Sequence, residues 1–207
     1  MRFVLFVEGD TERKGLPEFL KRWLDARFPT TRTGVHPVHF VGSSLLLKDA
    51  CTKAHQHLQD PAVIAVVALL DLYGRGGYPE DRRTVHDRYV WARRHLEKAV
   101  DHPRFRHFLA VHESEAWLLS DSSIFPRSIR EALPKGLREP EDIDFGKPPS
   151  VLLNLLYVKA TGRRYKKVVN GKDLFDRLDP EVAYQKCPHL RQMLDEMSRL
   201  AIEAGQP

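Results

Sequence analysis

The sequence has 207 residues, of which 42% are hydrophobic and 29% are charged, a balance that excludes an intrinsically disordered chain. No apolar run approaches the roughly 20 residues of a membrane-spanning helix, the start does not match a signal peptide, and Cys51 and Cys187 indicate no disulfide framework. The net charge of +5 favours an anionic partner, nucleic acid first, although it can also serve solubility alone. We therefore expect a cytoplasmic protein that is not bound to a membrane.

The first predicted element is a strand over Arg2–Val7, a nearly continuous apolar run that is typical of a buried strand in a parallel sheet. The strand stops at Glu8-Gly9-Asp10, and Thr11 offers a side-chain cap for a following helix. A carboxylate at the carboxyl end of a first strand lies where open α/β sheets hold their ligands. Glu8 is therefore the first candidate site residue.

Helix and strand signals then alternate. Residues 18–28 place apolar side chains at helical spacing, with Pro17 in the first turn, where proline is tolerated. Residues 35–41 predict a second strand, and residues 45–58 predict a second helix that one of two preceding serines can cap. This spacing of about 30 residues per strand–helix unit is typical of βαβ units and a parallel sheet.

The most apolar run, residues 63–70, predicts a central buried strand. It ends at Asp71, and the glycine-rich segment Gly74-Arg75-Gly76-Gly77 follows shortly afterwards. This layout repeats the one at Glu8. Residues 80–100 predict a long charged helix with one apolar face.

A further strand is predicted over residues 105–111, and Glu113 and Glu115 follow it. Three predicted strands therefore end in acidic residues: Glu8, Asp71, and Glu113 with Glu115. The carboxyl ends of parallel strands share one edge of a sheet, so these carboxylates are candidates for a common site.

The C-terminal part has a different composition. Residues 126–149 are rich in proline and charge and predict an irregular excursion or lid of short helices. Helices are predicted over residues 150–160 and 188–204. We divide the chain into an α/β core over residues 1–122 and a mainly helical extension over residues 123–207 that packs on the core as one compact unit.

The densest basic cluster of the sequence lies in this extension and consists of Arg163, Arg164, Lys166 and Lys167 around Tyr165, with Lys172 nearby. The cluster and Arg75 are candidate nucleic-acid contacts, in which cations grip phosphates and the tyrosine stacks on a base. A solvated turn between helices has the same composition, and both interpretations stay open.

Carboxylates at neighbouring strand ends repel one another unless a positive charge offsets them. A divalent cation does so, and oxygen ligands select Mg²⁺ or Mn²⁺ over softer metals. Mg²⁺ needs only one or two carboxylates when substrate phosphates complete its coordination, so phosphodiester hydrolysis or transfer is the chemistry that follows. Gly9 and Gly74 would let a sugar-phosphate backbone approach closely.

Three motifs carry a family resemblance: Val7-Glu8-Gly9-Asp10-Thr11-Glu12, Leu70-Asp71-Leu72-Tyr73-Gly74 and His112-Glu113-Ser114-Glu115-Ala116-Trp117-Leu118-Leu119. They resemble the Toprim (topoisomerase–primase) superfamily, and more narrowly the small Toprim-like proteins of domain-of-unknown-function family 4276, which are often encoded beside ATPases in phage-defence neighbourhoods. Tyr165-Lys166-Lys167 and Cys187-Pro188-His189-Leu190 are similar to the same family, so the match covers most of the chain. The resemblance implies an α/β, Rossmann-like Toprim fold with a mainly parallel sheet of about four strands, flanking helices and a helical C-terminal extension.

The resemblance also implies roles for single residues. Glu8 matches the family's glutamate, a general acid/base or metal ligand, and Asp71 matches the first aspartate of an Asp-x-Asp pair that binds Mg²⁺. Tyr73 stands where the second aspartate would be. Either Glu113 or Glu115 supplies the missing ligand, or the metal site is weakened; we favour Glu113, which is nearer the strand end, and keep Glu115 in reserve.

We therefore expect a Mg²⁺-dependent (or Mn²⁺-dependent) Toprim-type nuclease, a phosphodiester hydrolase that acts on nucleic acid in phage defence or DNA repair with an ATPase partner. The alternative is a non-catalytic regulatory or effector subunit of an ATPase complex with a degraded Toprim site. A zinc-peptidase motif fails because Ala116 stands where its second histidine is needed, and no lysine with a following serine or threonine completes a phosphate-binding loop. DNA or RNA as substrate and the oligomeric state, a homo-oligomer included, stay open.

Overall fold

The computed structural model describes residues 1–72, 78–134, 139–142 and 148–205. The predictions for Tyr73, Gly74 and Arg75 therefore lie outside the described residues.

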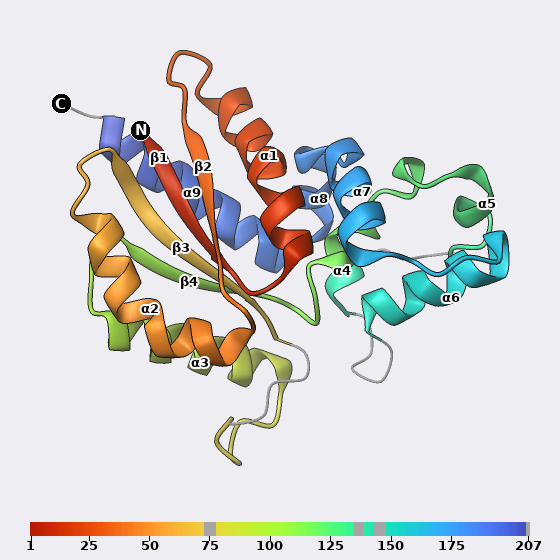
Figure 1. Ribbon diagram of the computed structural model, residues 1–207, viewed down its shortest axis with the longest axis horizontal. Helices are drawn as coiled ribbons and strands as arrows, with labels where there is room; N and C mark the ends of the chain where they lie inside the picture. The colour runs from red at the N-terminus through yellow and green to blue at the C-terminus, as the bar shows by residue number, and fades with distance from the viewer. Residues whose placement is uncertain (73–77, 135–138, 143–147, 206–207) are drawn as a thin grey trace.

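A four-stranded parallel sheet forms the centre of the protein (Figure 1). Its strands, in spatial order, are β2 (Gly34–His39), β1 (Arg2–Val7), β3 (Val63–Asp71) and β4 (Phe105–Ala110). With helices on both faces of this sheet and in the C-terminal part, the structure confirms the predicted α/β fold class.

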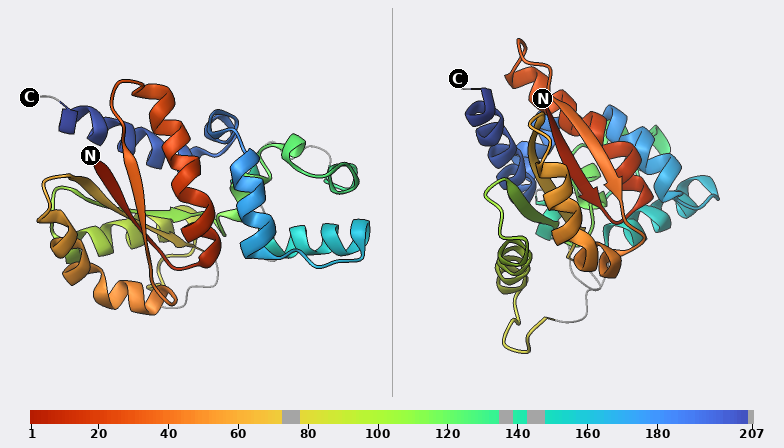
Figure 2. Two further views of the ribbon diagram at one scale, coloured as in Figure 1. Left: turned by 45° about the horizontal axis from the view of Figure 1, so that its top comes forward. Right: turned by 60° about the vertical axis from the view of Figure 1, so that its left-hand side comes forward.

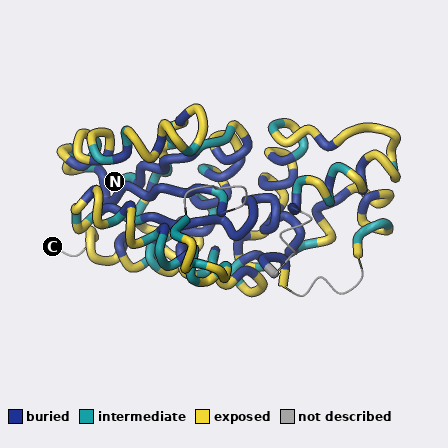
Figure 3. Tube along the Cα trace, turned by 90° about the horizontal axis from the view of Figure 1, so that it is seen from below, coloured by how far each residue is buried: buried dark blue, intermediate teal, exposed yellow. Residues whose placement is uncertain are grey.

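Helices α2 (Ser43–Leu58) and α3 (Val85–Val100) cover one face of the sheet, and α1 (Asp10–Arg27) and α9 (Pro188–Gly205) cover the other (Figures 1 and 2). Strand β1 shows why two layers are needed. Its side chains alternate, so that Phe3, Leu5 and Val7 join the core under α1 while Val4 and Phe6 join the core under α2. The strands are accordingly buried along nearly all of their length, except for edge strand β2. Figure 3 shows the buried interior enclosed by partly exposed outer segments.

The remaining helices are short, apart from one. They are α4 (Glu115–Leu118), α5 (Arg127–Arg130), α6 (Pro149–Thr161), α7 (Lys172–Arg177) and α8 (Pro180–Lys186), with 3₁₀ turns η1 (Ser122–Ile124) and η2 (Pro140–Asp142) and a π-helical turn η3 (Lys167–Gly171). Helices α7, α8 and α9 all contact α1. The approach of α7 is close, because a side chain on Gly15 of α1 would collide with Phe175. No helix in the described part of the chain is long and apolar enough to span a membrane.

Residues of the predicted excursion include a buried carboxylate, Glu141 of η2. It accepts hydrogen bonds from Trp117 Nε1 at 3.1 Å and from the backbone N–H groups of His189 at 2.7 Å and Leu190 at 3.2 Å. Glu141 thus satisfies the first N–H groups of α9, which need acceptors outside the helix. The described part of this excursion is consequently tied to the core at both α4 and α9.

Three predicted helix starts are wrong. In each case the residue that precedes the helix differs from the one that the prediction implied. Helix α1 begins at Asp10 after an extended Gly9, so Pro17 lies inside the helix and Thr11 provides no cap. Helix α2 begins at Ser43 after Gly42, whose φ of 89° favours glycine, and no serine side chain caps it. Helix α3 begins at residue 85 rather than 80, because Thr84 forms a capping box with the third residue of the helix.

Helix α6 begins at Pro149, one residue before its predicted start at Ser150. The cap residue is Pro148, and Ser150 is the second residue of the helix, with its backbone N–H free to bind a carboxylate from elsewhere.

Strand β2 forms the edge of the sheet beside β1. Its Gly34 N–H donates to the carbonyl oxygen of Met1 at 3.1 Å, and Phe40 N–H donates to the carbonyl oxygen of Val7 at 2.9 Å. The N–H groups of the even-numbered residues in this stretch therefore point toward β1, since successive residues of a strand alternate in direction.

Candidate functional site

The carboxyl ends of β1 and β3 bring Glu8 and Asp71 together. The two strands are neighbours, with Val7 opposite Leu69. Glu8 Oε1 accepts a hydrogen bond from the backbone N–H of Asp71 at 3.0 Å. This bond fixes the Glu8 carboxylate against the end of β3, so the two predicted residues share one edge of the sheet.

A third carboxylate at this edge, Glu12, was missed as a site residue. It lies in the first turn of α1, is buried, and accepts a hydrogen bond from Ser114 Oγ at 2.6 Å. A side chain on Gly9 would overlap the Glu12 carboxylate, so glycine is what leaves room for it there. The signal in the sequence was a glutamate four residues after Glu8, in a helix that begins directly at the strand end.

Glu113 is held by two donors from the C-terminal part. Its Oε1 accepts from Lys167 Nζ at 2.8 Å, and its Oε2 accepts from the backbone N–H of Ser150 at the start of α6, at 2.9 Å. Burial alone would raise the pKa of Glu113, but these two hydrogen bonds outweigh it and hold the pKa below its usual value. Glu113 is therefore a carboxylate that is already well paired.

Glu115 is the opposite case. It is fully buried, and neither of its oxygens has a hydrogen-bond partner within the described residues. Its nearest cation is Lys167, whose Nζ lies 3.5 Å from Oε1. Burial raises the pKa of Glu115 to about 7; Lys167 opposes this shift, while Glu12 and Glu113 add to it.

Asp71 shows the combined effect of these acids. Its pKa lies well above the usual value because of burial first, and then because of the negative charges of Glu12, Glu115, Glu8 and Glu113. We call these five residues the acidic cluster: Glu8, Glu12, Asp71, Glu113 and Glu115. Of these, sequence reasoning proposed all but Glu12.

Lys167 lies beside the acidic cluster, in contact with Glu113 and Glu115. It opens the π-helical turn η3, between α6 and α7. Burial alone would lower the pKa of Lys167, but the charges of Glu115 and Glu113 raise it above its usual value. Its side chain is nevertheless 45% exposed.

The other predicted basic residues lie elsewhere. Arg163, Arg164 and Lys166 line a separate hollow of about 510 Å³. Lys172 pairs with Asp176 on α7. Tyr165 is buried against Tyr157, so its ring is not open to stack on a base as one interpretation of the sequence required.

The donors fit a hard divalent cation only in part. Within the described residues, no group of three or more His, Cys, Asp or Glu side chains is arranged to hold a metal ion. Mg²⁺, however, accepts one or two carboxylates and retains several waters. The unpartnered oxygens of Glu115 and the acids crowded around Asp71 are the kind of donor set that such an ion would satisfy.

The helix-covered parallel sheet, with an acidic cluster at its carboxyl edge, makes this an α/β protein, and open sheets of this class hold their ligands at the carboxyl ends of the strands. The chain belongs to the family described as "Domain of unknown function (DUF4276)", whose model matches residues 7–198. This confirms the narrower of the two resemblances, the one to domain-of-unknown-function family 4276.

No curated protein matches the sequence. Among solved structures, the chain is similar to the C-terminal region of the Burkholderia pseudomallei OLD protein, with 15% sequence identity and a TM-score of 0.47. That similarity covers 99% of this chain and 98% of the other.

Proposed function

We propose that the protein is a Toprim-type nuclease that depends on Mg²⁺ or Mn²⁺ and hydrolyses phosphodiester bonds in nucleic acid. The observation that carries the proposal is the acidic cluster at the edge where α/β sheets hold their ligands. Buried carboxylates repel one another and lose hydration, so such a cluster is costly unless a cation offsets it. The net charge of the whole chain is nevertheless +5, which favours an anionic substrate.

In this proposal Glu8 and Asp71 hold the ion, and Glu113 or Glu115 completes its protein ligands. When bound, the ion would supply an activated water and offset the charge that develops on the phosphate. Lys167, already held by Glu113, would donate from its exposed side to a phosphate oxygen.

The basic hollow lined by Arg163, Arg164 and Lys166 supports nucleic acid as the substrate. These three side chains are exposed, and they precede Lys167 directly in the chain. Cations in such a row bind phosphates regardless of sequence. We expect Lys166→Ala to weaken binding uniformly across sequences and to reduce the slope of log affinity against log salt by about 1.

The decisive experiment measures metal-dependent cleavage of plasmid, oligodeoxynucleotide and RNA. Glu8→Gln keeps the shape of the side chain and removes its charge, so it should abolish cleavage while the circular dichroism melting curve stays that of a folded protein. Glu18→Gln is the matched control, because Glu18 is an exposed residue of α1, and it should cleave as the wild type does. Cleavage by Glu8→Gln at the wild-type rate would overturn the assignment.

A second candidate is a non-catalytic regulatory or effector subunit of an ATPase complex. Two observations favour it: Lys167 already pairs with Glu113, and α6 exposes the apolar side chains Val151, Leu155 and Val158 at helical spacing. This function predicts copurification with an ATPase and no Mn²⁺ binding by calorimetry. Measurable Mn²⁺ binding that Asp71→Asn removes would decide against it.

A further inference from the structure

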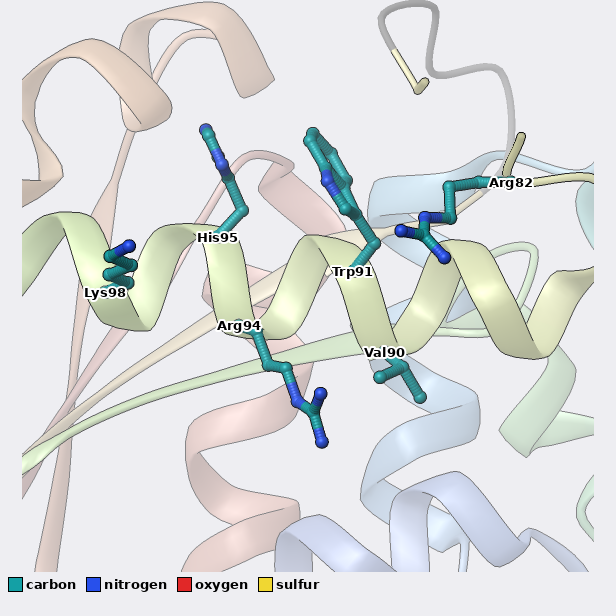
Figure 4. Close-up of a pocket in the computed structure, with 6 residues that line it drawn as sticks. All are labelled: Arg82, Val90, Trp91, Arg94, His95 and Lys98. Atoms are coloured by element: carbon teal, nitrogen blue, oxygen red, sulfur yellow. The ribbon is translucent and has the colours of Figure 1, made fainter. Parts of the chain in front are cut away.

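Helix α3 carries a surface hollow of about 290 Å³, which no residue of the acidic cluster lines (Figure 4). We call it the α3 groove; its described lining consists of Arg82, Val90, Trp91, Arg94, His95 and Lys98. Three of these side chains are cationic, two are aromatic and none is acidic. The groove therefore combines positive charge with flat rings.

The two rings already form a stack. Trp91 and His95 are four residues apart on α3, and their ring centroids lie 4.7 Å apart with an interplanar angle of 14°. Figure 4 shows the two side chains projecting side by side from the helix. Tyr78 packs edge-on against Trp91 at 5.9 Å, which limits the movement of the indole ring. His95 is exposed and Trp91 is only half-buried, so the stack is open to a further ring.

Two of the three cations in the groove have no ion-pair partner in the part of the chain that the structure describes. Arg94 and Lys98 are exposed, lie four residues apart, and form no ion pair within the described residues. Lys98 lies in the last turn of α3, where a cation favours the helix, but Arg94 does not, and like charges four residues apart repel each other, so helix stability does not account for the pair. The adjacent Arg93, by contrast, pairs with Glu97. A ligand with negative charges spaced along it would supply what Arg94 and Lys98 lack.

The groove also has a direction with respect to the acidic cluster. Strand β3 ends at Asp71, and α3 is the next helix, so the N-terminal end of α3 lies toward the same edge of the sheet (Figure 1). From Val85 the helix runs back along the sheet for about 20 Å to Lys98. Arg82 therefore marks the end of the groove that is nearer the acidic cluster.

We propose that the α3 groove binds single-stranded nucleic acid, with phosphates at Arg94 and Lys98 and a base stacked on the Trp91–His95 pair. Cations combined with an exposed ring are what single-strand binding uses, since every base has a flat face. A duplex keeps those faces inside its own stack and cannot offer one to Trp91. We further infer that the bound strand continues from the groove to the acidic cluster, and this part of the proposal rests on the proposed function.

The test measures fluorescence anisotropy of labelled oligothymidylate, oligouridylate and a duplex hairpin, in EDTA so that no cleavage occurs. Arg94→Ala with Lys98→Ala should weaken single-strand binding about tenfold and reduce the salt slope by about 1.4, as expected for two lost phosphate contacts. Lys48→Ala with Lys53→Ala removes the same charge from exposed positions of α2 and should bind as the wild type does.

Variants of the ring test the stacking separately. Trp91→Ala should weaken binding roughly 5- to 160-fold, whereas Trp91→Phe should retain most of the affinity because a ring remains. Melting curves establish whether each variant is folded. If Trp91→Ala does not fold, the binding measured for the Arg94→Ala/Lys98→Ala variant, whose substitutions are at exposed positions, tests the proposal instead. The relative affinities for oligothymidylate and oligouridylate show whether DNA or RNA is preferred.

The proposal is overturned if the folded Arg94/Lys98 variant binds the single strands as the wild type does, if the duplex binds more tightly than they do, or if no probe binds. Measuring the same affinities in a Glu8→Gln background separates the two proposals. Groove-dependent binding without any cleavage by the wild type would reject the nuclease and keep the groove. Cleavage without groove-dependent binding would reject the groove and keep the nuclease.

Discussion

Replacing Glu115 by glutamine should stabilise the metal-free protein at neutral and alkaline pH. The carboxyl group of Glu115 is fully buried, and its oxygens have no hydrogen-bond partner within the described residues. Glutamine has nearly the same shape and no charge. Lys167 would still be paired with Glu113 in the variant, so the substitution leaves no cation without its counter-charge.

The size of the effect follows from the pKa of Glu115, which burial raises from 4.5 to about 7. Between these pH values the native carboxyl group binds a proton that the unfolded chain has released, so stability falls as the pH rises through this window. Above the native pKa the penalty is complete, at most about 3 kcal/mol. We expect Glu115→Gln to gain about 1–3 kcal/mol near pH 8 and almost nothing near pH 4.5.

Urea denaturation in EDTA at both pH values measures this difference. Glu80→Gln, at an exposed position, is the control and should leave the free energy of unfolding unchanged at both pH values. A Glu115→Gln protein that is less stable than the wild type near pH 8, or that gains the same amount at both pH values, would refute the reasoning. Saturating Mg²⁺ should reduce the advantage of the variant, because a bound cation offsets the same charge.

Three further predictions address other contacts. Gly9→Ala places a methyl group where the Glu12 carboxylate lies, so calorimetry should show weaker Mg²⁺ binding with little change in melting temperature. Lys167→Met removes a hydrogen-bond donor from the buried Glu113 carboxylate, so urea denaturation should show a loss of about 1–3 kcal/mol that added Mg²⁺ partly restores. Arginines of α9 and β4 hold the pKa of Glu196 at about 2, so its contribution to stability is complete above about pH 4.5 and lost as the pH falls to 2. Glu196→Gln should therefore cost about 1–3 kcal/mol at neutral pH and nothing near pH 2.

Matched controls exist for all three. Gly34→Ala adds a methyl group at a position with ordinary contact distances and should not change Mg²⁺ binding. Lys172→Met and Glu203→Gln alter exposed ion pairs and should change stability by less than about 1 kcal/mol. Undiminished Mg²⁺ affinity in Gly9→Ala, unaltered stability in Lys167→Met, or a pH-independent effect of Glu196→Gln would each count against the corresponding argument.

The fold was predictable because its strands are short apolar runs at regular spacing. Residues 63–70, for example, are apolar on both faces, which only a central strand covered by helices explains. The helix starts were harder to predict from the sequence, since they depend on local backbone geometry. The apolar spacing of α3 is compatible with several starting points, and only the Thr84 capping box selects one of them.

The candidate site was predictable where it depends on strand ends and not where it depends on contacts between distant segments. Glu8 and Asp71 follow apolar runs and could be found from the sequence. The pairing of Lys167 with Glu113 spans 54 residues and depends on how η3 packs against α1 and α7, which no periodicity encodes. The same packing buries Tyr165. The basic cluster therefore divides: Lys167 contacts the acidic cluster, whereas Arg163, Arg164 and Lys166 line a separate hollow.

The edge strand of the sheet has a consequence for how copies of the chain meet. Since the even-numbered N–H groups of β2 point toward β1, position 37 would direct its N–H outward, and this residue is proline. Pro37 therefore removes a donor from the open edge without removing any bond from the sheet. If another strand approached this edge, one of its carbonyl groups would find no N–H donor at position 37. Strand β2 therefore resists the edge-to-edge association through which sheets aggregate.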